Sequence, residues 1–141
     1  MNSLPTDYPV LTLWRPWPTL IFEHDKRVEN RVWTTFHRGW MLLHAGKRFD
    51  LDAVHLAQEC GITLPDAAEV YMSSAVIGAV WLDSICREGR YGRPCDCGRW
   101  AMPGQFHWRL GGVHALPQPV QAAGMKGLIL TVGHIERFNP A

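Results

Sequence analysis

A continuous apolar run at residues 75–82 constrains the fold of this chain more than any other feature. It reads Ala-Val-Ile-Gly-Ala-Val-Trp-Leu, and Ser73-Ser74 and Asp83 bound it. A short apolar run between polar residues predicts a buried β-strand. Other apolar or mixed segments predict further strands, namely Val10–Leu13, Val28–Trp33, Trp40–His44, Phe106–Leu110, Val113–Leu116 and Leu128–Val132. The chain is therefore expected to be rich in β-structure.

Two segments between these strands carry the signals of short helices. Pro16 can occupy the first turn of a helix, and apolar residues follow it at helical spacing. Asp50 is suited to cap a helix over residues 51–60, which Gly61 would end. We therefore expect an α+β fold, built as a small, partly closed β-barrel with two or three short flanking helices.

Length and composition predict one globular domain. A chain of 141 residues can bury a core without disulfides or a metal. Residues 1–9 are rich in proline and polar side chains and predict a flexible N-terminal arm, which leaves residues 10–141 as the single domain. No apolar run reaches the ~18 residues that a membrane span needs, and no basic start precedes an apolar stretch. We expect a cytoplasmic protein with no membrane partner.

The charges are unevenly distributed along the chain. Between Phe49 and Ile85 there are six carboxylates and no Lys or Arg, whereas the remaining sequence carries all 14 cations and seven carboxylates. This segregation predicts one acidic and one cationic face, and the alternative is that the cations are spread around the surface. The net charge of +1 is not that of a protein that coats nucleic acid indiscriminately.

The cysteines predict free thiols. Cys60, Cys86, Cys95 and Cys97 do not have the spacing of a secreted disulfide framework. With His107, the last three give the pattern C-x8-C-x-C-x9-H, which differs from the paired cysteines of structural zinc sites. Free thiols are therefore favoured over a zinc site, and no metal or cofactor is predicted. No Walker motif, dinucleotide-binding glycine fingerprint, nucleophile elbow or H-E-x-x-H occurs, which excludes most nucleotide hydrolases, dehydrogenases and metalloproteases.

Two segments near the N-terminus combine tryptophans with cations. They are Trp14-Arg15-Pro16-Trp17 and Lys26-Arg27-Val28-Glu29-Asn30-Arg31. Trp and Arg are side chains that stack on bases and bind phosphates or carboxylates. In an extended chain Glu29 and Arg31 share one face, and Lys26 flanks them. A carboxylate between two cations predicts a polar recognition pocket, and the alternative is a structural ion pair.

The order of these and later segments resembles the ASCH domain of the PUA-like superfamily. The pattern is an apolar strand followed by x-R-P-W, K-x-V-E-x-R-x-W and R-G-x-x-x-x-H-A. It is carried by Leu11–Leu13, Arg15-Pro16-Trp17, Lys26, Val28-Glu29, Arg31, Trp33, Arg38-Gly39 and His44-Ala45. The similarity continues through residues 75–80, 100–108, 116–120 and 127–128, and so extends over nearly the whole chain.

The resemblance implies a PUA-like barrel whose central cleft binds RNA or another nucleic acid. The ligand-binding residues that it implies are Arg15, Trp17, Lys26, Glu29, Arg31, Trp33, Arg38, His44 and Trp100. Some members of the superfamily are small amidohydrolases that use a Lys, a Thr three residues later and a distant Glu. Here Lys26 is in register, but Glu29 stands where that Thr would be, so the resemblance does not support that activity.

Two other functions stay open. The protein could be a metal-independent enzyme that acts on RNA or a modified nucleoside, with Lys26, Glu29 and His44 as candidate catalytic residues. It could also be a protein-interaction adaptor that works through the acidic segment 49–85. The long loop expected at residues 86–105 carries Arg87, Arg90, Arg93 and Arg99 and predicts a cationic flap that attracts phosphates.

Overall fold

In the computed structural model, residues 8–64, 74–121 and 128–130 are described. The strands among them are β1 (Pro9–Arg15), β2 (Val28–Arg31), β3 (Gly39–Phe49), β4 (Ala75–Cys86), β5 (Phe106–Gln121) and β6 (Leu128–Leu130). The helices are α1 (Trp17–Glu23) and α2 (Leu51–Glu59), and a 3-10 turn, η1 (Gly89–Tyr91), lies between β4 and β5. The predicted acidic face includes residues 65–73, which lie outside the described part, as do residues 1–7 of the expected arm.

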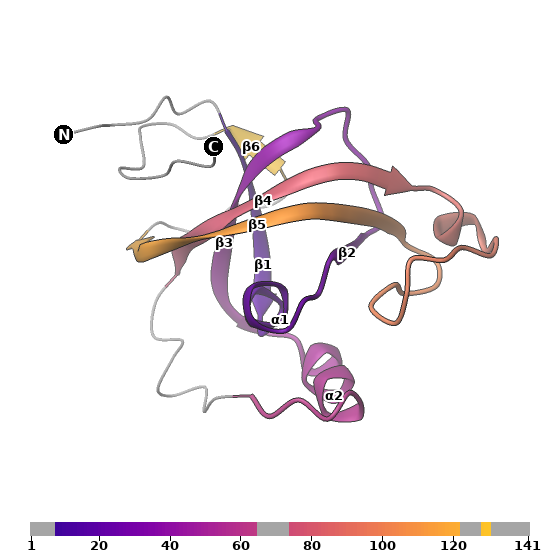
Figure 1. Cartoon of the computed structure of the whole chain (residues 1–141), viewed down its shortest axis with the longest axis horizontal. Coiled ribbons are helices and arrows are strands. Elements are labelled where there is room, and N and C mark those ends of the chain that lie inside the picture. Colours follow the sequence, from indigo (N-terminus) through magenta and orange to yellow (C-terminus); the bar gives the residue numbers. More distant parts are fainter. Residues whose placement is uncertain (1–7, 65–73, 122–127, 131–141) are drawn as a thin grey trace.

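The strands form one curved sheet in the order β2-β5-β4-β3-β1-β6. β1 and β3 run parallel, and the other neighbouring strands are antiparallel. Figure 1 shows β4 and β5 side by side across the molecule, with β1 and β3 at a steep angle to them. β2 and β6 lie at the two ends of this order, and no pairing joins them within the described residues. The fold is mixed α+β, as predicted, with an open sheet.

The predicted central strand is confirmed and is longer than the apolar run. β4 spans Ala75–Cys86 and lies between β3 and β5, so its backbone groups are paired on both sides. A main core cluster lies on one face of the sheet and includes Leu43, Val80 and Leu82. A second cluster, with Leu42 and Ala79, lies on the other face. Both faces are covered over residues 75–80, so this part of the strand needs apolar side chains at successive positions and not only at alternate ones, whereas Trp81 is exposed.

β5 is one strand where the sequence predicted two. It runs from Phe106 to Gln121 without ending at Gly111-Gly112. Leu82 pairs with Leu110 and Trp81 pairs with Gly112, so Gly111 is an extra residue in β5. A β-bulge of this kind absorbs one residue and bends the strand without ending it. The glycine pair therefore marks a bulge and not the turn that separates two strands.

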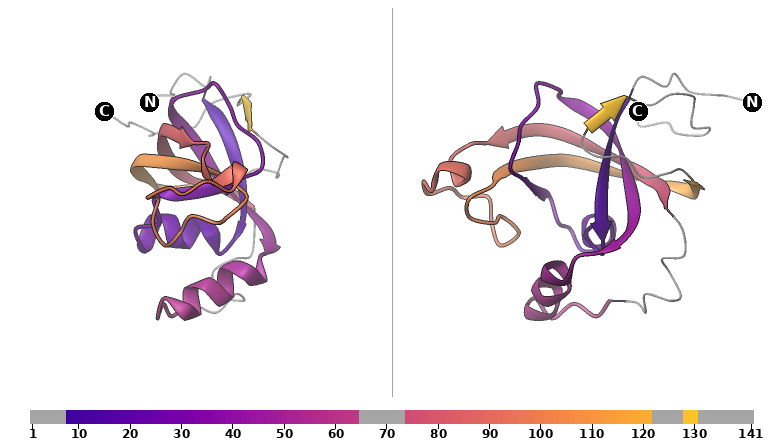
Figure 2. Two further views of the ribbon diagram at one scale, coloured as in Figure 1. Left: turned by 90° about the vertical axis from the view of Figure 1, so that its right-hand side faces the viewer. Right: turned by 180° about the vertical axis from the view of Figure 1, so that it is seen from behind.

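Both expected helices are present; α2 lies below the strands in Figures 1 and 2, and α1 lies at the level of the lower end of β1. α1 follows Pro16 and packs against β1 and β5. α2 begins after Asp50, whose side chain accepts a hydrogen bond from the backbone N–H of Asp52, as the cap prediction requires. The other carboxylate oxygen of Asp50 accepts from Nε1 of Trp17 at 2.8 Å, which ties the two helices together. No helix in the described ranges is long and apolar enough to cross a membrane.

Candidate functional site

Lys26, Glu29 and Arg31 form an ion-paired group that we call the inner network. Oε1 of Glu29 lies 3.3 Å from Nζ of Lys26, and Oε2 lies 3.3 Å from Nη2 of Arg31. Glu29 and Arg31 are on the edge strand β2, where residues two apart share a face. The predicted contact of one carboxylate with two cations is therefore confirmed.

Lys26 is the most deeply buried member of the inner network. Its exposed fraction is 0%, and its ammonium group donates to the carbonyl oxygen of Val28 and lies 4.7 Å from the centre of the Trp17 ring. Burial lowers the pKa of Lys26 below its ordinary value of 10.5, while the charge and hydrogen bond of Glu29 oppose this change. The amine is thus held in a site where its neutral form is easier to reach than in water.

Arg31 is half-buried, and not all of its hydrogen-bond donors have partners among the described residues. Nη2 of Arg31 donates to the carbonyl oxygen of Thr12 at 2.9 Å, and the guanidinium carbon lies 6.0 Å from the centre of the Trp33 ring. Nε of Arg31 and the hydroxyl of Thr34 are buried without a hydrogen-bond partner among the described residues. Buried polar groups are usually paired, so these two atoms are candidates for contact with a ligand acceptor. Thr34 was not among the predicted ligand-binding residues.

Three other predicted residues are buried inside the fold. Nε of Arg15 donates to the carbonyl oxygen of Gly46 at 2.9 Å, which joins the end of β1 to β3. Trp17 lies in the main core cluster and donates to Asp50. His44 is buried, and its Nδ1 lies 3.2 Å from the hydroxyl of Thr12. In this conformation none of these three side chains presents a free surface to a nucleic acid.

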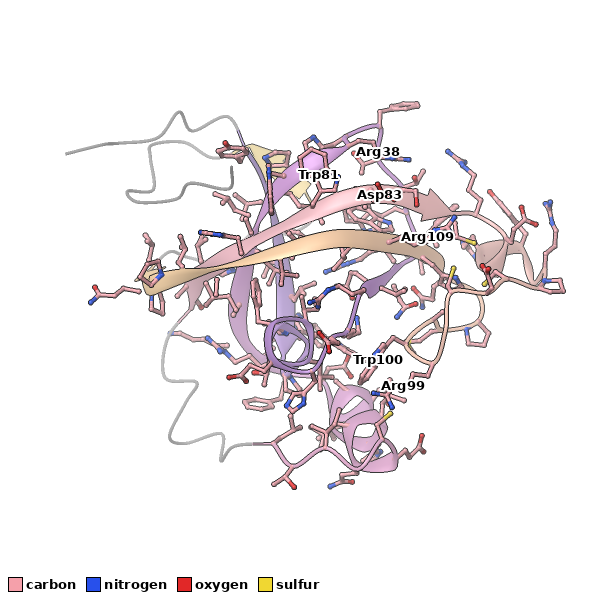
Figure 3. The ribbon with its side chains drawn as sticks, viewed as in Figure 1. Arg38, Trp81, Asp83, Arg99, Trp100 and Arg109 are labelled. Carbon is pink, nitrogen blue, oxygen red and sulfur yellow. The ribbon has the colours of Figure 1, made fainter. Side chains whose placement is uncertain are left out.

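The remaining predicted residues differ in their exposure. Trp33 is half-buried and packs edge-on against Trp108, with ring centres 4.9 Å apart. Trp100 is only 7% exposed and lies beneath the guanidinium of Arg99, at 4.8 Å; both are labelled in Figure 3. Arg38 is exposed and donates to two carbonyl oxygens of its own turn. Of the predicted contact residues, Arg31, Trp33 and Arg38 are therefore the ones that are at least partly exposed to solvent.

The loop between β4 and β5, residues 87–105, carries the densest group of exposed arginines in the described chain. All four predicted flap residues, Arg87, Arg90, Arg93 and Arg99, are exposed. Three of them lie over aromatic rings, at 6.0 Å for Arg87 on Phe106, 5.6 Å for Arg93 on Tyr91 and 4.8 Å for Arg99 on Trp100. A guanidinium held on a ring loses less freedom when it binds a phosphate. We call these four residues the arginine flap.

Asn30 fastens this loop to β2 and was not singled out in the sequence. Its Nδ2 donates to the carbonyl oxygen of Trp100 at 2.9 Å, and its Oδ1 accepts from the backbone N–H of Met102 at 2.8 Å. Asn30 lies between Glu29 and Arg31, so its side chain points to the opposite face of the strand. One short edge strand therefore carries Glu29 and Arg31 of the inner network and also fastens the loop.

The structure also brings together four side chains, namely His107 and three cysteines for which the sequence favoured free thiols. The sulfur atoms of Cys86, Cys95 and Cys97 and a ring nitrogen of His107 all lie within 4.8 Å of one another. Cys86 ends β4 and His107 is near the start of β5, and the two residues are directly paired across the strands. The spacing of these residues in the sequence does not reveal the cluster, because the pairing of β4 with β5 is what brings Cys86 and His107 together.

No family model and no curated protein matches the chain. The resemblance to ASCH domains therefore stays a prediction that depends on the residues quoted above.

Proposed function

We propose that this protein binds nucleic acid, RNA in particular, through the arginine flap together with Arg31 and Arg38, and that its domain is an ASCH-type, PUA-like barrel. The observation that carries the proposal is the arginine flap itself. Among the described residues its only ion pair joins Arg93 to Glu88, at 3.4 Å between partly exposed side chains. Guanidinium groups without carboxylate partners are suited to contact phosphates.

The placement of the flap supports a continuous binding surface. In the pairing of β2 with β5, Arg31 lies opposite Phe106, whose ring lies beneath Arg87. Asn30 joins the same part of β2 to the loop segment that bears Arg99 and Trp100. A single strand of RNA that follows the flap would therefore pass the half-buried guanidinium of Arg31.

In this proposal the buried residues of the predicted site act as supports. Glu29 pairs with Lys26 and holds the guanidinium of Arg31, and Arg15 and His44 hold β1 against β3. Trp100 supports Arg99 from beneath, and Trp33 offers the half-buried ring nearest to Arg31. Base stacking, which is worth about 1–3 kcal/mol for each base, is assigned to Trp33.

The test is fluorescence anisotropy with a labelled short single-stranded RNA. Arg99→Ala should weaken binding for every sequence and reduce the slope of log affinity against log salt by about 0.7, the value for one phosphate contact on a single strand. Arg48→Ala is the matched control, because Arg48 also lies over a tryptophan, Trp14 at 5.6 Å, but is carried by β3. Equal effects of the two changes, or no binding at low salt, would contradict the proposal.

The burial of Lys26 favours a second candidate, an enzyme that uses acid–base chemistry. A lysine whose pKa is lowered by burial, 3.3 Å from a carboxylate, is a known arrangement for a general base. The discriminating measurement is product formation from RNA or modified nucleosides. Lys26→Met should abolish turnover in an enzyme, whereas Lys47→Met, at an exposed position of β3, should not. Turnover that survives Lys26→Met would eliminate this candidate.

A further inference from the structure

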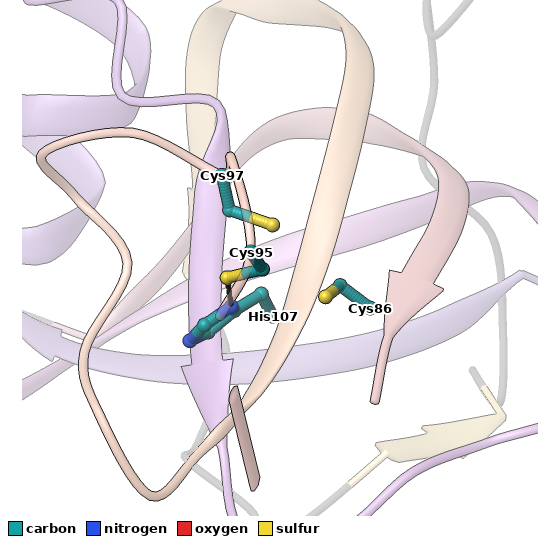
Figure 4. Close-up of side chains that lie close together, drawn as sticks. All are labelled: Cys86, Cys95, Cys97 and His107. Atoms are coloured by element: carbon teal, nitrogen blue, oxygen red, sulfur yellow. Dashed lines mark hydrogen bonds between the residues drawn. The ribbon is translucent and has the colours of Figure 1, made fainter. Parts of the chain in front are cut away.

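Four potential metal ligands meet at one end of the hairpin formed by β4 and β5 (Figure 4). Cys86 and His107 are cross-strand partners, and the loop that follows β4 turns back so that Cys95 and Cys97 reach the same point. We propose that Cys86, Cys95, Cys97 and His107 bind one zinc ion as a structural site. The proposal is independent of nucleic-acid binding.

The donor set and its spacing fit tetrahedral zinc. Zinc sites with three cysteines and one histidine are closed structural sites, with Zn–S bonds of about 2.3 Å that place sulfur atoms about 3.8 Å apart. The four ligand atoms here already lie within 4.8 Å of one another. Small side-chain rotations would therefore complete the site without a change in the strands. Thiolate ligands select zinc over magnesium or calcium, which prefer oxygen.

His107 is oriented as a metal ligand. Its Nε2 lies 2.7 Å from the carbonyl oxygen of Met102, which can only accept, so Nε2 carries the proton. Nδ1 is then the basic nitrogen, and it faces the sulfur of Cys95 at 3.4 Å. Metal-bound histidines almost always donate their other ring N–H to such an oxygen, which fixes the ring. Asn30 in turn holds Met102 through its backbone N–H.

The surroundings of the thiols also suit a cation. The three sulfur atoms lie within 4.8 Å of one another and of a ring nitrogen of His107. Three adjacent thiols cannot all ionise because their charges repel one another, whereas a zinc ion deprotonates the thiols that coordinate it.

Zinc would fix the loop that carries the arginine flap. The ligands lie at both ends of residues 87–105 and within that segment, so one ion would fasten the loop to the strands. Three thiolates and one zinc carry a net charge of −1, which the neighbouring arginines offset. A recess of about 340 Å³, lined in part by Cys95, Cys97 and His107, offers the ion a path from solvent.

The first test is the zinc content of protein purified with zinc in the medium. The wild-type chain should contain one zinc per chain, and so should Cys60→Ser, the matched control, because Cys60 lies outside the cluster. Cys86→Ser and His107→Ala should bind zinc more than about 100-fold more weakly. This loss is larger than the usual effect of removing a residue that only hydrogen-bonds to a metal ligand. Metal-free wild-type protein with four titratable thiols, a disulfide among the three cysteines, or bound iron would overturn the proposal.

The second test does not depend on whether those variants fold. Cobalt added to metal-free wild-type protein should give the thiolate charge-transfer and tetrahedral d–d absorption bands at one ion per chain, and added zinc should displace the cobalt. Absence of these bands would overturn the proposal. Gly89→Ala places a Cβ about 2.2 Å from Cε1 of the His107 ring, so it should weaken metal binding about 10–100-fold. Gly112→Ala, where the nearest atoms are 3.9 Å away, should not.

Discussion

Replacement of Glu29 by glutamine removes the counter-charge of the fully buried Lys26 and of the half-buried Arg31. The amide oxygen can still accept from the backbone N–H of Asn30, which lies 3.1 Å from the carboxylate. Loss of one member of a buried ion pair costs about 3–5 kcal/mol, because the other charge stays buried without a partner. Arg31 is partly solvated and adds less, so we expect a loss near the lower limit, about 3 kcal/mol. Urea unfolding at neutral pH measures this loss directly.

The control is Asp25→Asn in the ion pair of Asp25 with Arg27. The distance is also 3.3 Å, but the Asp25 side chain is 95% exposed. Asparagine tolerates the left-handed φ of +57° at this position, so only the charge changes. The expected loss is about 0.5 kcal/mol or less.

Lys26→Met supplies the counter-test, because it removes the charge that Glu29→Gln leaves unpaired. In the Glu29→Gln background it should recover more than half of the lost stability, since methionine fills a buried site without a charge. Equal losses of unfolding free energy for Glu29→Gln and Asp25→Asn, or no recovery in the double variant, would refute the claim that burial makes the ion pairs of the inner network costly to break.

Two other predictions concern pH and the loop. The folded pKa of Lys26 lies below its unfolded value of 10.5, so the unfolded chain binds more protons between the two values. The stability linked to this shift is fully present above pH 10.5 and is lost as the pH falls through the folded pKa. The unfolding free energy of wild type minus that of Lys26→Met should therefore increase with pH towards 10.5. A difference that does not change with pH contradicts this. Asn30→Ala removes two hydrogen bonds to the loop and should cost about 1–3 kcal/mol, with faster trypsin cleavage after Arg99 than in wild type. An unchanged cleavage rate would show that Asn30 does not hold the loop.

Features that depend on local sequence could be predicted. The apolar run at residues 75–82 identified β4 because the strand is covered on both faces over residues 75–80 and needs apolar side chains at successive positions there. Asp50 identified the start of α2, since a cap and its helix are adjacent in the chain. The contacts of Glu29 with Lys26 and Arg31 follow from spacings of two and three residues. Their burial could not be read from the same spacing.

Features that depend on long-range packing could not be predicted. Trp17 and Trp100 were candidates for base stacking, yet Trp17 donates to a carboxylate 33 residues away and Trp100 is covered by the fold. A tryptophan that packs and one that stacks on a ligand have the same local sequence. Cys86 and His107 meet because β4 pairs with β5, and this pairing leaves no simple trace in the spacing of the cysteines.

The most direct test of the proposed function is the salt dependence of RNA binding by the wild-type protein. If the four arginines of the flap, Arg31 and Arg38 each contact a phosphate of a single strand, log affinity should fall with log salt with a slope of about −4, at about 0.7 for each contact. Binding that does not change with salt, or no binding of RNA or single-stranded DNA at low salt, would contradict the proposal that this surface recognises nucleic acid.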